Sequence, residues 1–197
     1  MKIIFLDHDG VICLDNNWGS RKKKQDKWGG RKLSMSLREI PLEYRFDNFD
    51  KKAIDVLNEI LETTGAEIVV SSDWKAWASI EQMGEYYEMQ GIIKKPIAYT
   101  KNLGQCSFQD TKSFIWSSTY DLEQSRYVEI TQYLMDHQEI THWVSVDDLH
   151  MGRHVENSKY GAFDRDDWGL ENFVWTPRPS EGIKQSGVKE KILKYLS

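Results

Sequence analysis

The apolar run at residues 3–6, IIFL, followed at once by Asp7 and Asp9, most constrains the fold of this chain. An apolar run of this length that ends in a turn is typical of a fully buried strand, and Gly10 provides a turn residue. The two carboxylates then lie at the carboxyl end of the strand, where open α/β sheets bind their ligands. The sequence therefore predicts a buried strand that delivers acids to a ligand site.

Two further apolar runs end in polar residues in the same way. The stretch AEIVVSS ends at Ser71 and Ser72, and the stretch THWVSVDD ends at Asp147 and Asp148. A fourth strand is predicted in residues 172–177, NFVWTP. Because neighbouring parallel strands finish at one edge of a sheet, we expect these polar side chains to converge there.

Helical patterns separate the predicted strands. In DKKAIDVLNEILETTGA, Asp50 is a suitable N-cap, Gly65 a suitable stop, and one face is apolar: Ala53, Ile54, Leu57, Ile60 and Leu61. Further helices are predicted in residues 73–91, 120–138 and 186–196, the second with an apolar face: Val128, Ile130, Tyr133, Leu134 and Met135. This alternation predicts an α/β fold with a parallel sheet and helices on both faces.

The length of 197 residues favours a single domain, residues 1–197. Residues 13–48 are polar, basic and weakly periodic, so we interpret them as a small cap-type insertion after the first strand. Two cysteines are too few for a disulfide framework, and no run reaches the roughly 18 apolar residues of a membrane span. The expected location is cytoplasmic, without a signal peptide or a membrane partner.

Converging carboxylates indicate a cation. Four acids packed together would repel one another and raise their own pKa values unless a cation lies among them. Oxygen ligands without a set of Cys or His favour a hard ion, so Mg²⁺ is the predicted cofactor. Such an arrangement suits phosphoryl transfer, with Asp7 forming an aspartyl-phosphate that water releases.

Three motifs resemble those of the haloacid dehalogenase (HAD) superfamily: FLDHDGVI its first, IVVSSDW its second and WVSVDD its fourth. More narrowly, TGAEIVVSSDWK, SRYVEITQYL, VSVDD and FVWTPRPSEGI are similar to the phosphatase-like branch found in Swiss Army Knife RNA repair proteins. Residues 13–48 and 96–116 match poorly. The resemblance implies a Rossmann-like three-layer sandwich with a parallel central sheet.

The resemblance also implies roles for individual residues. Asp7 would be the nucleophile, and Asp9 the acid and base, with its backbone carbonyl on magnesium. Ser71 would hold a phosphate oxygen, with Ser72 close by, and Arg126 is the best match to the basic third motif. A serine after a strand is also a common helix cap, and Arg126 could equally be a solvated helix residue.

Asp147 and Asp148 would complete the metal site, and either could touch the ion directly. Lys75 stands where this branch commonly has Arg; its role is open, and we place it with the residues expected to contact substrate. We expect Glu123 and Glu129 to be surface charges on their helix.

The segment SRKKKQDKWGGRK, residues 20–32, is strongly basic in an otherwise acidic chain. It holds seven Lys or Arg and one Asp, a net of +6, so the rest carries −11 within a total of −5. Lys22, Lys23 and Lys24 beside Trp28 combine phosphate-neutralising charge with a ring on which a base could stack. A solubilising loop is the alternative.

These patterns predict a Mg²⁺-dependent phosphomonoesterase that acts through an aspartyl-phosphate. Its expected substrate is a nucleic-acid end or a nucleotide, specifically a 3′-phosphate. A phosphatase of small phosphometabolites and a non-catalytic nucleic-acid-binding module are the alternatives. No protein partner can be inferred.

Overall fold

The computed structural model describes residues 1–30, 35–101, 119–158, 161–164 and 169–197, with residues 119–121, 154–158 and 161–164 described by their backbone alone. The described residues form a five-stranded, all-parallel sheet in the order β3-β2-β1-β4-β7. Its strands are β1 (Lys2–Leu6), β2 (Glu67–Val70), β3 (Ala98–Tyr99), β4 (His142–Asp147) and β7 (Phe173–Trp175). An antiparallel hairpin, β5 (His154–Ser158) and β6 (Gly161–Asp164), lies outside this sheet.

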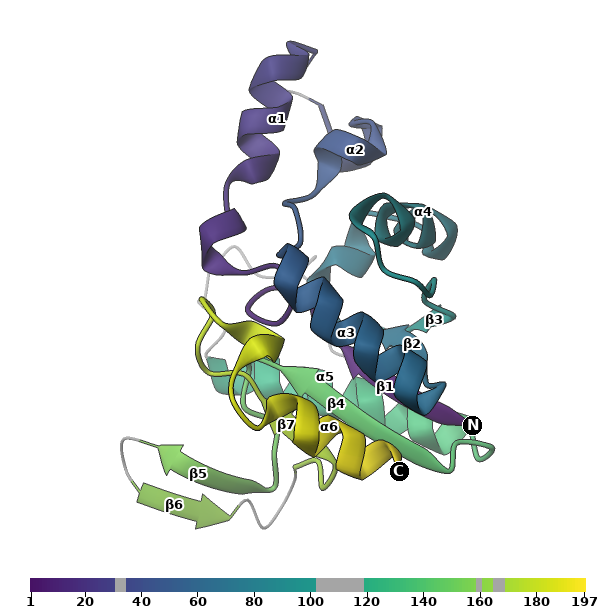
Figure 1. The fold of residues 1–197 in the computed structure, drawn as a ribbon, viewed down its shortest axis with the longest axis vertical. Helices are drawn as coiled ribbons and strands as arrows, with labels where there is room; N and C mark the ends of the chain where they lie inside the picture. Colours follow the sequence, from purple (N-terminus) through teal and green to yellow (C-terminus); the bar gives the residue numbers. More distant parts are fainter. Residues whose placement is uncertain (31–34, 102–118, 159–160, 165–168) are drawn as a thin grey trace, which may run out of the picture.

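Helices cover both faces of the sheet. The helices of the described residues are α1 (Ser20–Trp28), α2 (Leu42–Arg45), α3 (Lys51–Thr64), α4 (Ile80–Gln90), α5 (Thr119–Asp136) and α6 (Val188–Leu196), of which α1 and α2 lie in the insertion and not on the sheet. One core cluster joins the sheet to α3, α4 and α6, and a second joins its opposite face to α5. Figure 1 shows this layering, with α3 and α6 in front of the sheet and α5 behind it. The predicted α/β sandwich with a parallel sheet is confirmed.

The strand register places the predicted site residues at one level. Leu6 of β1 pairs with Val70 of β2 and with Val146 of β4. The next step along each strand is Asp7, Ser71 and Asp147. The backbone N–H of Asp7 donates to Val146 O at 3.1 Å, and that of Ser71 donates to Leu6 O at 2.9 Å. Three strands separated by long stretches of chain therefore end side by side.

Helix α3 forms as its pattern predicts. The Asp50 side chain accepts a hydrogen bond from the Ala53 N–H, and Gly65 ends the helix with φ +68°. All five residues of its predicted apolar face are buried.

Helix α5 differs from its predicted pattern. Ile130 and Tyr133 are buried, but Val128 and Met135 are 44% and 63% exposed. Their places on the buried face are taken by polar residues, Glu123, Arg126 and Glu129, each 8% exposed. The prediction that the two glutamates are surface charges is wrong, because the helix turns this charged stripe toward the carboxyl edge of the sheet.

The segment predicted as one helix at residues 73–91 is divided. Asp73–Ala76 is a single 3₁₀ turn, and α4 begins at Ile80 because Ser79 and Gln82 cap it reciprocally. The short strand β3 and the hairpin were not predicted. Neither has the sustained alternation of apolar residues that identifies a strand.

The insertion at residues 13–48 contains α1 and α2, and it extends beyond the carboxyl side of the sheet (Figure 1). Arg45, 4% exposed, anchors it: the guanidinium donates to the carbonyls of Ile40 and Trp77 and to the side chain of Gln82. These contacts tie the insertion to the residues at the start of α4. Among the described residues, no helix has the length and apolar character needed to cross a membrane.

Candidate active site

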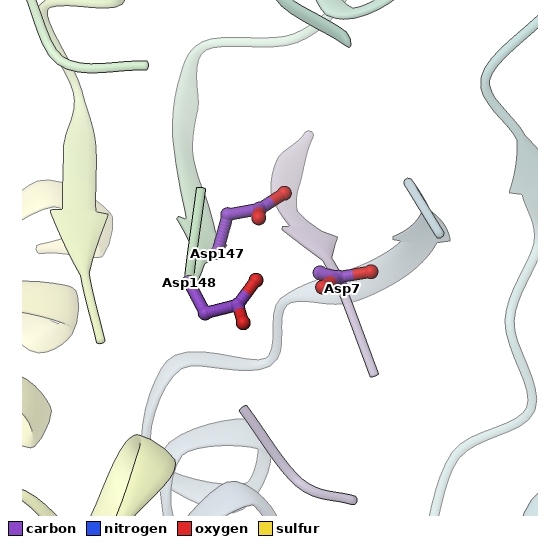
Figure 2. A group of neighbouring side chains, drawn as sticks. All are labelled: Asp7, Asp147 and Asp148. Atoms are coloured by element: carbon purple, nitrogen blue, oxygen red, sulfur yellow. The ribbon is translucent and has the colours of Figure 1, made fainter. Parts of the chain in front are cut away.

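Three carboxylates gather at the carboxyl edge of the sheet. Asp7, Asp147 and Asp148 each offer an oxygen atom, and these atoms lie within 4.8 Å of one another. Figure 2 shows Asp147 and Asp148 extending from the end of β4 toward Asp7 at the end of β1. Asp7 is 3% exposed and Asp147 fully buried. The structure thus brings together three of the four acids predicted to bind metal.

Arg126 of α5 pairs with two of these acids. Its Nη1 lies 3.1 Å from Asp7 Oδ1 and 2.9 Å from Asp147 Oδ2. Its Nη2 lies 3.1 Å from Oδ1 of Asp73, whose side chain is mostly exposed. The guanidinium therefore links the two buried acids to the exposed Asp73 at the rim of the site. The sequence pattern did not suggest a role for Asp73.

Burial of the three acids raises their pKa values. Desolvation raises the pKa of Asp7 well above the ordinary value, although Arg126 opposes it. Desolvation also raises the pKa of Asp147, again against the effect of Arg126. Burial, followed by repulsion from Asp7, raises the pKa of Asp148 to about 7. One guanidinium does not compensate two buried acids and a partly buried third, so the cluster favours an additional cation.

Gly10 allows the cluster to close. Its φ is +70°, and a Cβ atom built on it would lie 2.4 Å from Asp148 Oδ2. Thr176, which follows β7, donates its hydroxyl to Gly10 O at 3.2 Å. A side chain at position 10 would therefore displace the third acid.

Ser71 and Ser72 follow β2 beside Asp7, and each is 1% exposed. Ser71 Oγ has no hydrogen-bond partner among the described residues. A buried hydroxyl without a partner is costly, unless a ligand supplies one. This hydroxyl lies at the end of β2, the strand next to the one that ends at Asp7.

Asp9 lies outside the group of three carboxylates. Its Oδ2 accepts a hydrogen bond of 2.8 Å from the indole N–H of Trp74. Burial raises its pKa, and the Trp74 hydrogen bond opposes that rise. A part in metal binding by its backbone carbonyl remains a prediction. Trp74 was not singled out from the sequence, although it directly follows the SSD of the second motif.

His8, between the two motif acids, faces the opposite way. It is fully buried, its Nε2 lies 2.7 Å from the Tyr87 hydroxyl, and Trp74 packs edge-on against it. Burial lowers its pKa to about 3, so the ring is neutral. Its ring packs among Phe49, Trp74 and Tyr87, whereas Asp7 faces Arg126 of α5.

Lys75 and Glu129 form a buried ion pair beside the site. Their side chains are 8% and 10% exposed. The Thr100 hydroxyl, which follows β3, lies 3.0 Å from both Lys75 Nζ and Glu129 Oε2. The pair connects the 3₁₀ turn after β2 to α5, the helix that carries Arg126, and Thr100 adds the end of β3 to this contact.

The basic residues of the insertion lie on α1. Lys22 and Lys23 are exposed, whereas Lys24 donates to Asn48 Oδ1 at 2.8 Å and lies over the Tyr86 ring. Trp28 stacks on Tyr44 at a centroid distance of 5.4 Å. Of the five residues predicted to contact substrate, Lys24, Trp28 and Lys75 therefore also pack within the protein, while Lys22 and Lys23 face solvent.

Comparison with models of protein families matches residues 3–184 to the HAD domain in Swiss Army Knife RNA repair proteins. This confirms the resemblance drawn from the motifs, and the matched range includes every candidate site residue. Searches of curated proteins and of solved structures found no significant match.

Proposed function

This chain belongs to the family of HAD domains found in Swiss Army Knife RNA repair proteins, and from that premise we propose that it is a magnesium-dependent phosphomonoesterase. The proposed substrate is a nucleic-acid end or nucleotide bearing a terminal phosphate, specifically a 3′-phosphate. The observation that carries the proposal is the convergence of Asp7, Asp147 and Asp148 on one point beside Arg126.

The donor set fits magnesium. The three acids offer only oxygen atoms, which lie within 4.8 Å of one another. Hard oxygen ligands of this kind suit Mg²⁺, which usually keeps several waters and binds one or two carboxylates directly. When bound there, the ion would neutralise charge on the carboxylates and on the substrate phosphate.

Asp7 is the proposed nucleophile. Its carboxylate oxygen forms a bond to phosphorus as the bond between phosphorus and the ester oxygen breaks, which leaves an aspartyl-phosphate. The departing oxygen takes a proton from Asp9. Water then attacks phosphorus, Asp9 takes its proton, and the bond to Asp7 breaks to release phosphate.

The surroundings of Asp9 support this double role. Burial raises the pKa of Asp9, so the residue can hold a proton closer to neutral pH than an exposed aspartate can. The Trp74 N–H fixes one oxygen of the carboxyl group at 2.8 Å. This hydrogen bond restricts the rotation of the carboxyl group, and proton transfer by its other oxygen is part of the proposal.

Two side chains would bind the transferred phosphoryl group. Ser71 Oγ, buried and without a partner among the described residues, can donate to a phosphate oxygen. Arg126, which already contacts Asp7, can donate to another oxygen and stabilise the charge that develops there. These roles are proposals that rest on the geometry around Asp7.

A nucleic-acid substrate is supported by the family and by the exposed Lys22 and Lys23 on α1. Removal of the terminal phosphate from oligonucleotides should slow steeply as ionic strength rises, because each phosphate that the protein neutralises adds to the salt dependence of binding. Hydrolysis of mononucleotides should change much less. Comparable salt dependence for the two substrates would favour a phosphatase of small phosphometabolites.

The test of the chemistry is Asp7→Asn, assayed with p-nitrophenyl phosphate and Mg²⁺. The amide is a poor nucleophile, so we expect activity to fall to the level of a blank. Asp55→Asn, an exposed change on α3, is the matched control and should retain the parent rate. Parent-like hydrolysis by Asp7→Asn would exclude the proposed mechanism.

A further inference from the structure

A groove follows the outer side of the edge strand β7. Its volume is about 880 Å³, and its walls come from α6, from the segment after β4 and from the residues that flank β7. Figure 1 shows α6 lying along β7. No step of the proposed chemistry uses this groove.

The groove is basic although the chain is acidic. Four cationic side chains line it, Arg153, Arg178, Lys191 and Lys194, against the single acid Glu171. This lining has a net charge of +3, whereas the whole chain carries −5. The groove therefore concentrates positive charge next to an acidic site.

These cations remain available to an anionic ligand. Arg153 pairs with Glu171 at 3.0 Å, and Arg178 pairs with Glu181 at 3.2 Å. Both members of each pair are well exposed, and ion pairs between exposed side chains are weak. Lys191 and Lys194 have no ion-pair partner among the described residues, and both are exposed.

Aromatic rings lie between the cations. His150, Phe173, Trp175 and Tyr195 line the same groove, and all are only partly buried. The ring centroids of His150 and Trp175 are 4.5 Å apart, and those of His150 and Phe173 are 5.6 Å apart. Partly exposed aromatic rings interleaved with cations are the combination that binds single-stranded nucleic acid, since bases stack on the rings and phosphates pair with the cations.

One end of the groove lies beside the backbone that carries Asp147 and Asp148. Trp175, the last residue of β7, pairs in register with Asp147 and donates its indole N–H to Asp148 O at 2.8 Å. The groove lining follows α6 from Gly187, its N-cap, to Lys194. These residues are seven positions apart, so at 1.5 Å per residue the groove extends roughly 10 Å along the helix, away from the acids. Roughly three stacked nucleotides span that length at about 3.4 Å each.

We propose that this groove binds the single-stranded segment of the nucleic acid that leads to the terminal phosphate. The inference rests on the proposed function for the identity of that phosphate, but the binding itself can be measured without catalysis. The strand would lie along β7 and α6, with its last nucleotide beside Trp175 and its phosphate at Asp7.

The test measures binding of a fluorescein-labelled 12-nucleotide RNA that lacks a terminal phosphate, by anisotropy in EDTA. Lys191→Glu/Lys194→Glu should weaken binding at least roughly tenfold. It should also reduce the slope of log K against log salt by about 1.4, because each phosphate contact contributes about 0.7. Lys51→Glu/Lys52→Glu, the same charge change at exposed positions of α3, should bind like the parent.

Lys22→Glu/Lys23→Glu tests the competing surface on α1. If this variant loses binding while the α6 variant binds like the parent, or if the parent does not bind the RNA at all, the groove proposal is overturned. Hydrolysis of p-nitrophenyl phosphate should be the same in the α6 variant and the parent. If the parent protein does not hydrolyse p-nitrophenyl phosphate, the proposed function is contradicted. The anisotropy measurement would still show whether the groove binds RNA.

Discussion

Asp7 and Asp147 share one nitrogen atom of a single guanidinium: Nη1 of Arg126 lies 3.1 Å from Oδ1 of Asp7 and 2.9 Å from Oδ2 of Asp147. The arginine thus partly compensates two of the three clustered acids. Asp148 is the third, and burial together with Asp7 raises its pKa to about 7. The cluster is therefore expected to respond to both protons and divalent cations.

The first prediction concerns pH and magnesium. The pKa values of Asp7, Asp147 and Asp148 are raised in the folded protein above the ordinary value of 3.8. Between pH 4 and about 7 the folded state then binds more protons than the unfolded state, so these acids make the metal-free protein less stable as pH rises.

Magnesium should oppose this loss, because it replaces the protons. At 100 times its Kd a ligand stabilises the folded state by about 2.7 kcal/mol. Thermal unfolding in EDTA and in Mg²⁺ should show a larger increase in Tm at pH 7.5 than at pH 5.5. An equal increase at both values would contradict the assigned cation site.

The second prediction is that Gly10→Ala abolishes magnesium-dependent activity. Position 10 has φ +70°, and the new Cβ would lie 2.4 Å from Asp148 Oδ2, so Asp148 must move. The matched control is Gly19→Ala, where φ is +81° and a Cβ meets nothing within 4 Å. Both variants should lose roughly 1–2 kcal/mol of stability from the left-handed backbone.

Only Gly10→Ala should also lose the increase in Tm produced by Mg²⁺. Activity and magnesium response measured on both proteins separate the two effects. If the variants behave alike, the loss comes from backbone strain and not from Asp148.

The third prediction concerns Trp74. Its indole N–H opposes the rise that burial causes in the pKa of Asp9, so Trp74→Phe should raise that pKa further. Phe can keep the stacking on Phe46 and Phe49. The limb of the pH profile of kcat/KM that Asp9 governs should move to higher pH.

The control for Trp74→Phe is Trp77→Phe, at a side chain that is 40% exposed. Its pH profile should coincide with that of the parent. An unshifted profile for Trp74→Phe would remove Asp9 from the proton-transfer role.

The fourth prediction is that Glu129→Gln destabilises the protein, by up to about 3–5 kcal/mol, because it leaves the ammonium of Lys75 buried without its counter-charge. Adding Lys75→Met should restore most of the lost stability, since the double variant removes both charges. Chemical denaturation of the parent, the two single variants and the double variant measures the coupling. Additive losses would show that the pair does not act as a unit.

The sequence by itself determined the parallel sheet and the position of the acids at its carboxyl edge. Apolar runs that end in DHD, SS and DD, separated by helical patterns, specify parallel strands whose carboxyl ends meet. Helix α3 could also be predicted to its capping residues, because caps and apolar periodicity are local properties.

Only the tertiary structure decided which neighbours these acids have. Trp74 meets Asp9 across 65 positions of sequence, and Lys75 meets Glu129 across 54. No local pattern distinguishes a helix face with a few buried charges from a solvated one, so the burial of Glu129 on α5 depended on packing. The groove along β7 likewise joins residues of α6 to residues after β4, which become neighbours only when the chain folds.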